Sequence, residues 1–187
     1  TNKGEPGVRS TYTSHKAVGR NSQEALAKSP RSLPGVGPRI AAKISTLGIS
    51  TIRELLYHLP RRHIPVVAIR KLAHGEEQGV VGVVWETRLV KTGGSRRQAT
   101  EAILSDETGN LRAIWFNQPF VARTLRAGNR IFVSGHLGRQ YRGQTNLEVT
   151  SYEVINQDDE VFADGRLVPI YPSTEGLPQR TLRRTIR

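Results

Sequence analysis

The 187-residue chain contains no cysteine, so disulfide bonds and cysteine-ligated zinc are excluded. Methionine is also absent, even at position 1, and we therefore expect the chain to be a piece of a longer protein. No apolar run approaches the roughly 18 residues that a membrane span needs, and no signal peptide is visible. The sequence thus predicts a protein with no membrane partner, compatible with a reducing cytoplasm.

The motifs that would indicate catalysis are missing as well. The chain has no G-x-x-x-x-G-K-[ST] phosphate loop for ATP, no H-E-x-x-H zinc motif and no nucleophile elbow. Its five histidines are scattered, and Pro60 separates the two nearest, His58 and His63. We therefore expect no catalytic residue, no metal site and no cofactor in this chain.

Positive charge is what the sequence has in excess. Lysine and arginine total 28 against 16 acidic residues, giving a formal net charge of +12 and a pI near 10.8. Most of the excess is arginine, whose planar guanidinium matches phosphate and stacks on bases. A polyanion is the partner class that this composition favours, and a basic surface serving only solubility is the alternative.

The first third of the chain is predicted to be a tail followed by helices. Residues 1–22 are polar and lack periodicity, as in a flexible tail or linker. Residues 23–64 form a helical segment in which LPGVGP at 33–38 separates helices, Gly48 ends the second, and Pro60 stops a third. The third helix places Ile52, Leu55, Leu56 and Leu59 on its apolar side.

The hydrophobic period changes to two after the basic connector at 61–63. Alternating apolar residues predict five strands near 81–85, 102–104, 111–115, 131–137 and 147–154, with a register slip near Ser151 and a short helix at about 118–126. In the first strand, Val81, Val83 and Trp85 are predicted to face the core. Five strands with a helix between the third and fourth indicate a mainly β protein whose residues 65–156 form an OB-fold barrel. Residues 157–187 are predicted to be an irregular connector ending in a basic cluster.

The segment WFNQPFVARTLR at 115–126 carries the sharpest functional signal. If Trp115 faces the core, Phe116 points outward at the strand end, and helical geometry places Phe120 away from the apolar stripe beside Arg123. Exposed aromatic rings beside arginines are what a base-stacking platform needs. The alternative is that Phe116 packs against Val121 at the start of the helix.

Two further segments are candidate phosphate contacts. The glycine hairpin with Gly35 and Gly37 precedes a helix and resembles a helix-hairpin-helix motif, to which Arg39 and Lys43 would add charge. Its alternative role is a turn that only packs two helices together. The loop GRQYRGQT at 138–145 joins the last two predicted strands, where OB-folds often bind nucleic acid, and offers Arg139, Tyr141 and Arg142. A solvated hairpin is the alternative there.

Three separated motifs resemble one family in its own order. LPGVGPRIAAKISTLGISTIRELLYHLPRR is similar to the segment that opens the wedge region of the RecG family of bacterial ATP-dependent DNA helicases. WFNQPF resembles the stacking segment of that wedge, and GRLVPIYPSTEGLPQRTLRRTI resembles the stretch leading to its motor domains.

The resemblance implies an OB-fold wedge that separates strands at replication forks and four-way junctions, in fork reversal, branch migration, recombination and repair. Phe116 and Phe120 would stack on the unpaired bases. ATP and Mg²⁺ would act in motor domains of the same parent chain, which this piece lacks. The implied protein would lie in a bacterial cytoplasm, associated with the nucleoid, or in an organelle. It would be a monomer, with single-strand-binding protein as a further partner. A stand-alone OB-fold binder of RNA or single strands, and a protein-interaction module, are the alternative functions.

Overall fold

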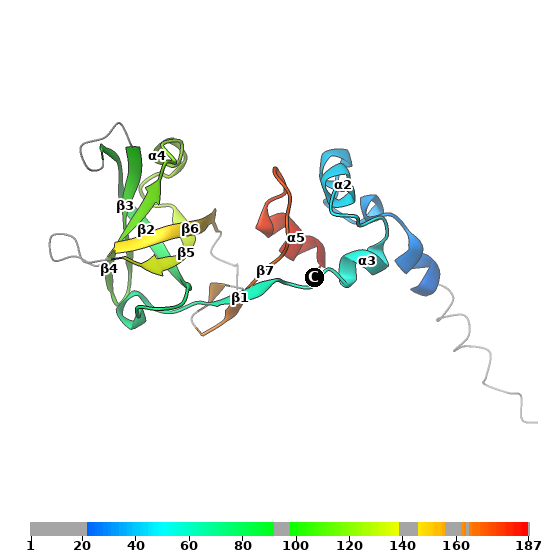
Figure 1. Ribbon diagram of the computed structural model, residues 1–187, viewed down its shortest axis with the longest axis horizontal. Helices are drawn as coiled ribbons and strands as arrows, with labels where there is room; N and C mark the ends of the chain where they lie inside the picture. Colours follow the sequence, from blue (N-terminus) through cyan, green and yellow to red (C-terminus); the bar gives the residue numbers. More distant parts are fainter. Residues whose placement is uncertain (1–21, 92–97, 139–145, 156–161, 164, 187) are drawn as a thin grey trace, which may run out of the picture. The chain divides into compact units, whose positions relative to one another are not determined.

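The computed structural model describes residues 22–91, 98–138, 146–155, 162–163 and 165–186. The chain divides into two compact units, one of Thr1–Pro60 with Tyr171–Arg187 and one of Arg61–Ile170 (Figure 1). Each unit is built from its own core. Within the described residues, no helix is long and apolar enough to cross a membrane.

The larger unit is a closed five-stranded barrel. Its strands are β2 (Gln78–Lys91), β3 (Gln98–Asp106), β4 (Gly109–Phe116), β5 (Arg130–Leu137) and β6 (Asn146–Val154). They pair in the order β2-β3-β4-β6-β5, and β5 closes the barrel on β2. Only the β4–β6 contact is parallel among these pairs of the described strands, and the short helix α4 (Val121–Thr124) follows β4. This is the strand order of an OB-fold and confirms the predicted fold class.

Alternating side chains of the strands fill the barrel. Leu104, Leu111, Trp115 and Ile131 are fully or almost fully buried, as their period-two pattern predicts. The β5–β6 register shifts where Ser134 pairs with Ser151 and the next pair skips Thr150, so the slip predicted near Ser151 is present. Such a bulge bends the strand and helps a small sheet to close.

The prediction for the first barrel strand was wrong about its inward face. Val80 and Val84 are buried, whereas Val83 is 40% exposed and Trp85 is 69% exposed. Every residue from Val80 to Val84 is apolar or glycine, so alternation could not separate the two faces. Gly82 takes the inward position between the buried valines, because an added Cβ would lie 3.2 Å from the Leu104 Cβ. A register shift between Val84 and Glu86 then offsets the rest of the strand.

A two-stranded ribbon adjoins the barrel. β1 (Arg62–Pro65) pairs antiparallel with β7 (Leu167–Ile170), and the 3₁₀ turn η3 (Ile69–Lys71) leads on to β2. Their inward residues Ile64 and Val168 join Phe132 and Phe162 in a second buried cluster. The irregular tail predicted for 157–187 is therefore wrong in part, because β7 and the helix α5 (Gln179–Ile186) are regular elements.

The smaller unit is helical. Residues 22–27 are helical, and η2 (Pro30–Ser32), α2 (Pro38–Ser45), α3 (Ile52–Leu56) and α5 follow along the chain. Ile44, Leu55, Leu177 and Leu182 are among the buried residues of its core, so the last described residues pack with the N-terminal helices.

The third predicted helix is shorter than expected. Thr51 and Glu54 form a capping box that starts α3, but the helix ends at Leu56. Leu56 and Leu59, predicted on its apolar side, are 50% and 70% exposed. Because the helix stops before Leu59, helical spacing does not align Leu59 with Leu55, whereas Leu56 lies at the end of the helix on its exposed side.

Candidate nucleic-acid interface

Phe116 is placed on the outside of the barrel by strand geometry. It is the last residue of β4 and pairs with Ala99 of β3, next to the buried Trp115. Since neighbouring side chains of a strand point to opposite faces, the burial of Trp115 turns Phe116 outward, and its side chain is 46% exposed.

The turn after Phe116 is fixed by hydrogen bonds to β3. Asn117 adopts a left-handed conformation with φ of 56°, which asparagine tolerates better than most residues. Its backbone N–H donates to the Gln98 carbonyl at 3.1 Å, and the buried Thr100 hydroxyl donates to the Gln118 carbonyl at 2.8 Å. The chain therefore leaves β4 in a defined direction.

Phe120 lies at the start of α4 and is 55% exposed. The helix covers only Val121–Thr124, shorter than the predicted 118–126, so Phe120 is its N-cap residue and does not lie inside the helix. Val121 and Leu125 are buried in the barrel core and hold the helix down. Arg123 is exposed on the same short helix. The structure thus brings two exposed rings and an arginine onto one corner, and their role in binding stays a prediction.

The outer face of the sheet beside Phe116 carries an ion-pair cluster. Glu101 of β3 contacts Arg112 of β4 at 2.5 Å and Arg88 of β2 at 3.1 Å. The Glu101 side chain is only 7% exposed, while Arg88 remains 53% exposed. The hydrogen bond and the charge of Glu101 raise the pKa of Arg88 above its usual value. No local pattern indicates this cluster, because the three residues come together only through strand pairing.

The other predicted contacts lie either outside the described residues or in the other unit. Arg139, Tyr141 and Arg142 lie outside the described residues. The glycine hairpin belongs to the helical unit, where Gly35 has φ of +80° and Gly37 is the N-cap of α2. Arg39 is exposed and Lys43 is half-buried on that helix.

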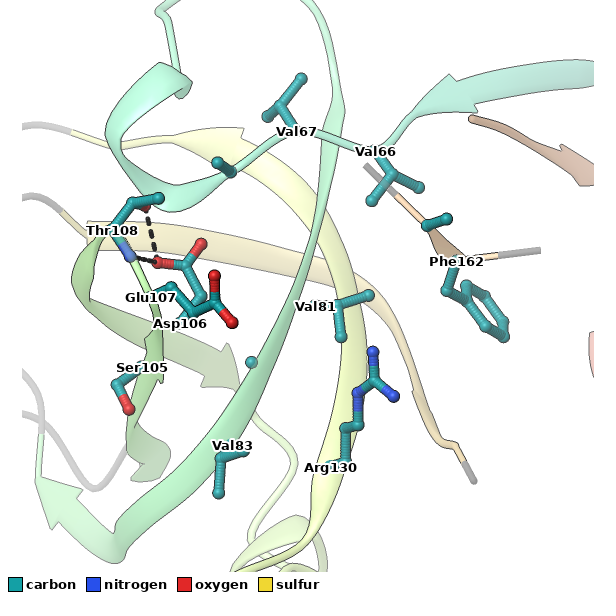
Figure 2. Close-up of a pocket in the computed structure, with 13 residues that line it drawn as sticks. Val66, Val67, Val81, Val83, Ser105, Asp106, Glu107, Thr108, Arg130 and Phe162 are labelled. Carbon is teal, nitrogen blue, oxygen red and sulfur yellow. Dashed lines mark hydrogen bonds between the residues drawn. The ribbon is translucent and has the colours of Figure 1, made fainter. Parts of the chain in front are cut away.

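A pocket of about 450 Å³ opens on the side of the barrel (Figure 2). Valines and Phe162 supply its apolar wall, and Arg130 and Glu107 are among its charged groups. Asp106, also in the wall, accepts hydrogen bonds from the N–H groups of Ile69, Thr108 and Gly109. Burial raises the pKa of Asp106, but these hydrogen bonds outweigh it, so the pKa lies below its usual value. Asp106 is therefore occupied in holding the β3–β4 turn.

Trp85 is an exposed aromatic residue of the barrel unit that the sequence prediction missed. Its indole N–H donates to the Ser105 hydroxyl at 2.5 Å, which fixes one edge of the ring while 69% of the residue stays exposed. The five residues before Trp85 are all valine or glycine, so their pattern is compatible with either face of β2 pointing inward. This ambiguity is the one signal that Trp85 could point outward.

Comparison with known protein families shows which family this chain belongs to. The family model described as RecG wedge domain matches residues 31–187. The chain belongs to the RecG wedge domain family. The ATP-dependent DNA helicase RecG of Escherichia coli K12 is 32% identical over 157 residues, covering 82% of this chain and 22% of that protein. The RecG helicase of Thermotoga maritima is 30% identical over 156 residues, covering 80% of this chain and 19% of that protein.

A solved structure of RecG bound to a three-way DNA junction is also similar to this chain. It has a TM-score of 0.59 at 28% identity and covers 86% of this chain and 22% of the solved one. The chain therefore spans about a fifth of the length of these RecG relatives. The segment WFNQPF, quoted above for its likeness to the wedge, is the one that places Phe116 and Phe120 at the exposed corner.

Proposed function

We propose that this chain is the branched-DNA-binding wedge of a RecG-type ATP-dependent DNA helicase. The observation that carries the proposal is the pair of half-exposed rings, Phe116 and Phe120, held on one corner of an OB-fold barrel. The similar RecG structure bound to a three-way junction supports branched DNA as the ligand class.

The physical role of the two rings follows from what an opening base pair loses. A base at a branch point gives up its stacking neighbour, and an aromatic ring replaces that neighbour at about 1–3 kcal/mol per base. Stacking on a ring is insensitive to base identity, and phosphate contacts carry no direct sequence information. Basic groups such as Arg123, together with Arg139, Tyr141 and Arg142 of the 139–145 segment, would hold the phosphates. Such a corner separates strands at any sequence.

The activity of the whole protein is part of the same proposal. Strand separation would be driven by motor domains of the parent chain, which would use ATP and Mg²⁺, in fork reversal, branch migration and repair. Single-strand-binding protein is a proposed further partner, and a bacterial cytoplasm with nucleoid association the proposed location. No described residue of this chain is assigned a catalytic role in that cycle.

The test compares fork affinity between wild type and ring variants. Phe116→Ala and Phe120→Ala should each weaken binding to a three-way junction by about 5- to 150-fold, which corresponds to the loss of one stacked base. Affinity for plain duplex should change much less. Both substitutions remove exposed rings, so the thermal unfolding midpoint should stay close to wild type.

The matched controls are Phe116→Leu and Phe120→Leu. Leucine keeps an apolar side chain of similar size but offers no π face, so these variants should bind junctions as weakly as the alanine variants. Wild-type junction affinity in all four correctly folded variants would refute the stacking role. Equal wild-type affinity for plain duplex and junction would refute branch selectivity, and a preference for unbranched RNA would favour a stand-alone single-strand binder.

A further inference from the structure

Trp85 and Phe116 lie on the same outer face of the β2-β3-β4 sheet. Phe116 pairs with Ala99 near one end of β3, and Trp85 is hydrogen-bonded to Ser105 near the other end. Ser105 shares its face with Glu101 and Ile103, because Leu104 and Ala102 between them point into the core. Six residues at about 3.3 Å each separate the two ring positions by about 20 Å along β3.

The surface between the two rings is half-buried and electrically balanced. Ile103 and Ile114 contribute partly exposed apolar side chains. Arg88 and Arg112 both pair with Glu101, and Glu86 supplies the remaining charge, so the formal charges of these four residues cancel. A strip without net charge attracts phosphates only weakly, and its two isoleucines suit the flat faces of bases whose phosphates point to solvent.

The Trp85 ring is held for recognition through its faces. Its only hydrogen-bonding group, the indole N–H, already donates to Ser105. What remains for a partner is the π surface of the largest aromatic side chain, at 69% exposure. Strands two and three of OB-folds, which are β3 and β4 here, form the face on which oligonucleotides bind.

We infer that Trp85 is a second base-stacking residue, on which an unpaired DNA strand continues after it leaves the Phe116 corner. This inference rests on the proposed function, because the strand reaches Trp85 from the branch point. An OB-fold covers roughly 4–16 nucleotides of single strand, so one strand is long enough to reach both rings. The net charge of +12 on the whole chain supports a nucleic acid over an acidic or neutral protein as the occupant.

The test uses the 187-residue chain and oligothymidine strands of increasing length, from a dinucleotide, which is too short to span the two rings, to roughly 16 nucleotides. Trp85→Ala should weaken binding of the longer strands by about 5- to 150-fold and leave the shortest strands, which reach a single ring, almost unaffected. The dependence of affinity on salt should keep its slope, because that slope counts neutralised phosphates and the lost contact is a stacked base.

Trp85 also reports on its own occupancy. The second tryptophan, Trp115, is 1% exposed in the core, so fluorescence quenching by bound oligothymidine would come from Trp85. Trp85→Phe should keep most of the affinity and lose the quenching. The matched control is Leu89→Ala on the same strand, since Leu89 is 48% exposed but pairs with Thr100 on the opposite face and should bind normally.

Two results would overturn the inference. One is wild-type affinity of folded Trp85→Ala for every strand length, and the other is a changed salt slope, which would indicate a phosphate contact and not stacking. Either result leaves the proposed function standing if Phe116→Ala and Phe120→Ala still lose junction affinity. If those variants also bind normally, both proposals fail.

Discussion

At the scale of single residues, Glu101 is the buried charge on which the outer sheet face depends. Its side chain is 7% exposed and its neighbour Arg112 is 11% exposed. Glu101→Ala leaves the Arg112 guanidinium buried without this carboxylate, and breaking a buried pair in this way costs about 3–5 kcal/mol. Urea denaturation should show that loss. Arg88→Ala is the control and should cost far less, because Arg88 is half in solvent. Equal losses in the two variants would contradict a buried pair as the cause.

Asp106 makes the stability of the barrel depend on pH in the acid range. Its pKa is lowered in the folded state, so its hydrogen bonds stabilise the fold above the unfolded value near 3.8 and are lost as pH falls through the folded value. Asp106→Asn should therefore be less stable than wild type at pH 7, and the difference in free energy of unfolding should shrink below about pH 3.8. A difference that stays constant down to pH 2 would show that the carboxylate charge plays no part.

Phe116 and Trp85 show what a single sequence can and cannot predict at this scale. Leu111, Ala113 and Trp115 alternate with polar or partly exposed neighbours, so the outward position of Phe116 follows from period two alone. The residues before Trp85 are apolar on both faces, and the register shift that turns Trp85 outward depends on its pairing with β3. Local pattern therefore predicted the exposure of the Phe116 ring and missed that of the Trp85 ring.

At the scale of elements, the β5–β6 bulge needs glycine at position 135. A Cβ added to Gly135 would lie well inside van der Waals contact of the Glu148 carbonyl, a backbone atom that cannot rotate away. Gly135→Ala should therefore destabilise the barrel by about 1–3 kcal/mol in chemical denaturation. Gly109→Ala is the matched control, because its added Cβ meets only Ile69 at 3.8 Å and its effect should stay within about 0.5 kcal/mol. Equal effects would show that the close approach is relieved by strand movement.

The elements predicted from sequence are those with local signals. The five barrel strands have alternation and turn residues, and α2 has Pro38 at its start and Gly48 after its end. The ribbon of β1 and β7 joins segments about a hundred residues apart, so no local sequence pattern could predict their pairing. The helix α5 is strongly basic, and it was predicted to be an irregular tail because its packing partners Ile44 and Leu55 are distant in sequence.

At the scale of the whole molecule, the two units differ in how the chain supplies their cores. The barrel unit is continuous from Arg61 to Ile170, whereas the helical unit needs both ends of the chain. Its core joins Ile44 and Leu55 from the first end with Leu177 and Leu182 from the last. Both tryptophans lie in the barrel unit, so tryptophan fluorescence monitors that unit alone.

This difference predicts how the protein responds to being cut. Residues 61–170 expressed alone should fold and unfold cooperatively, because their two buried clusters are complete within that segment. Residues 1–60 alone should lack a stable helical fold, because removing Leu177 and Leu182 takes two buried leucines from a small core, at about 2–5 kcal/mol each. Adding a peptide of residues 171–187 should restore helicity by circular dichroism, and the same peptide with Leu182→Ala should not. A stable 1–60 segment without the peptide would show that the last residues only dock on a core that is already formed.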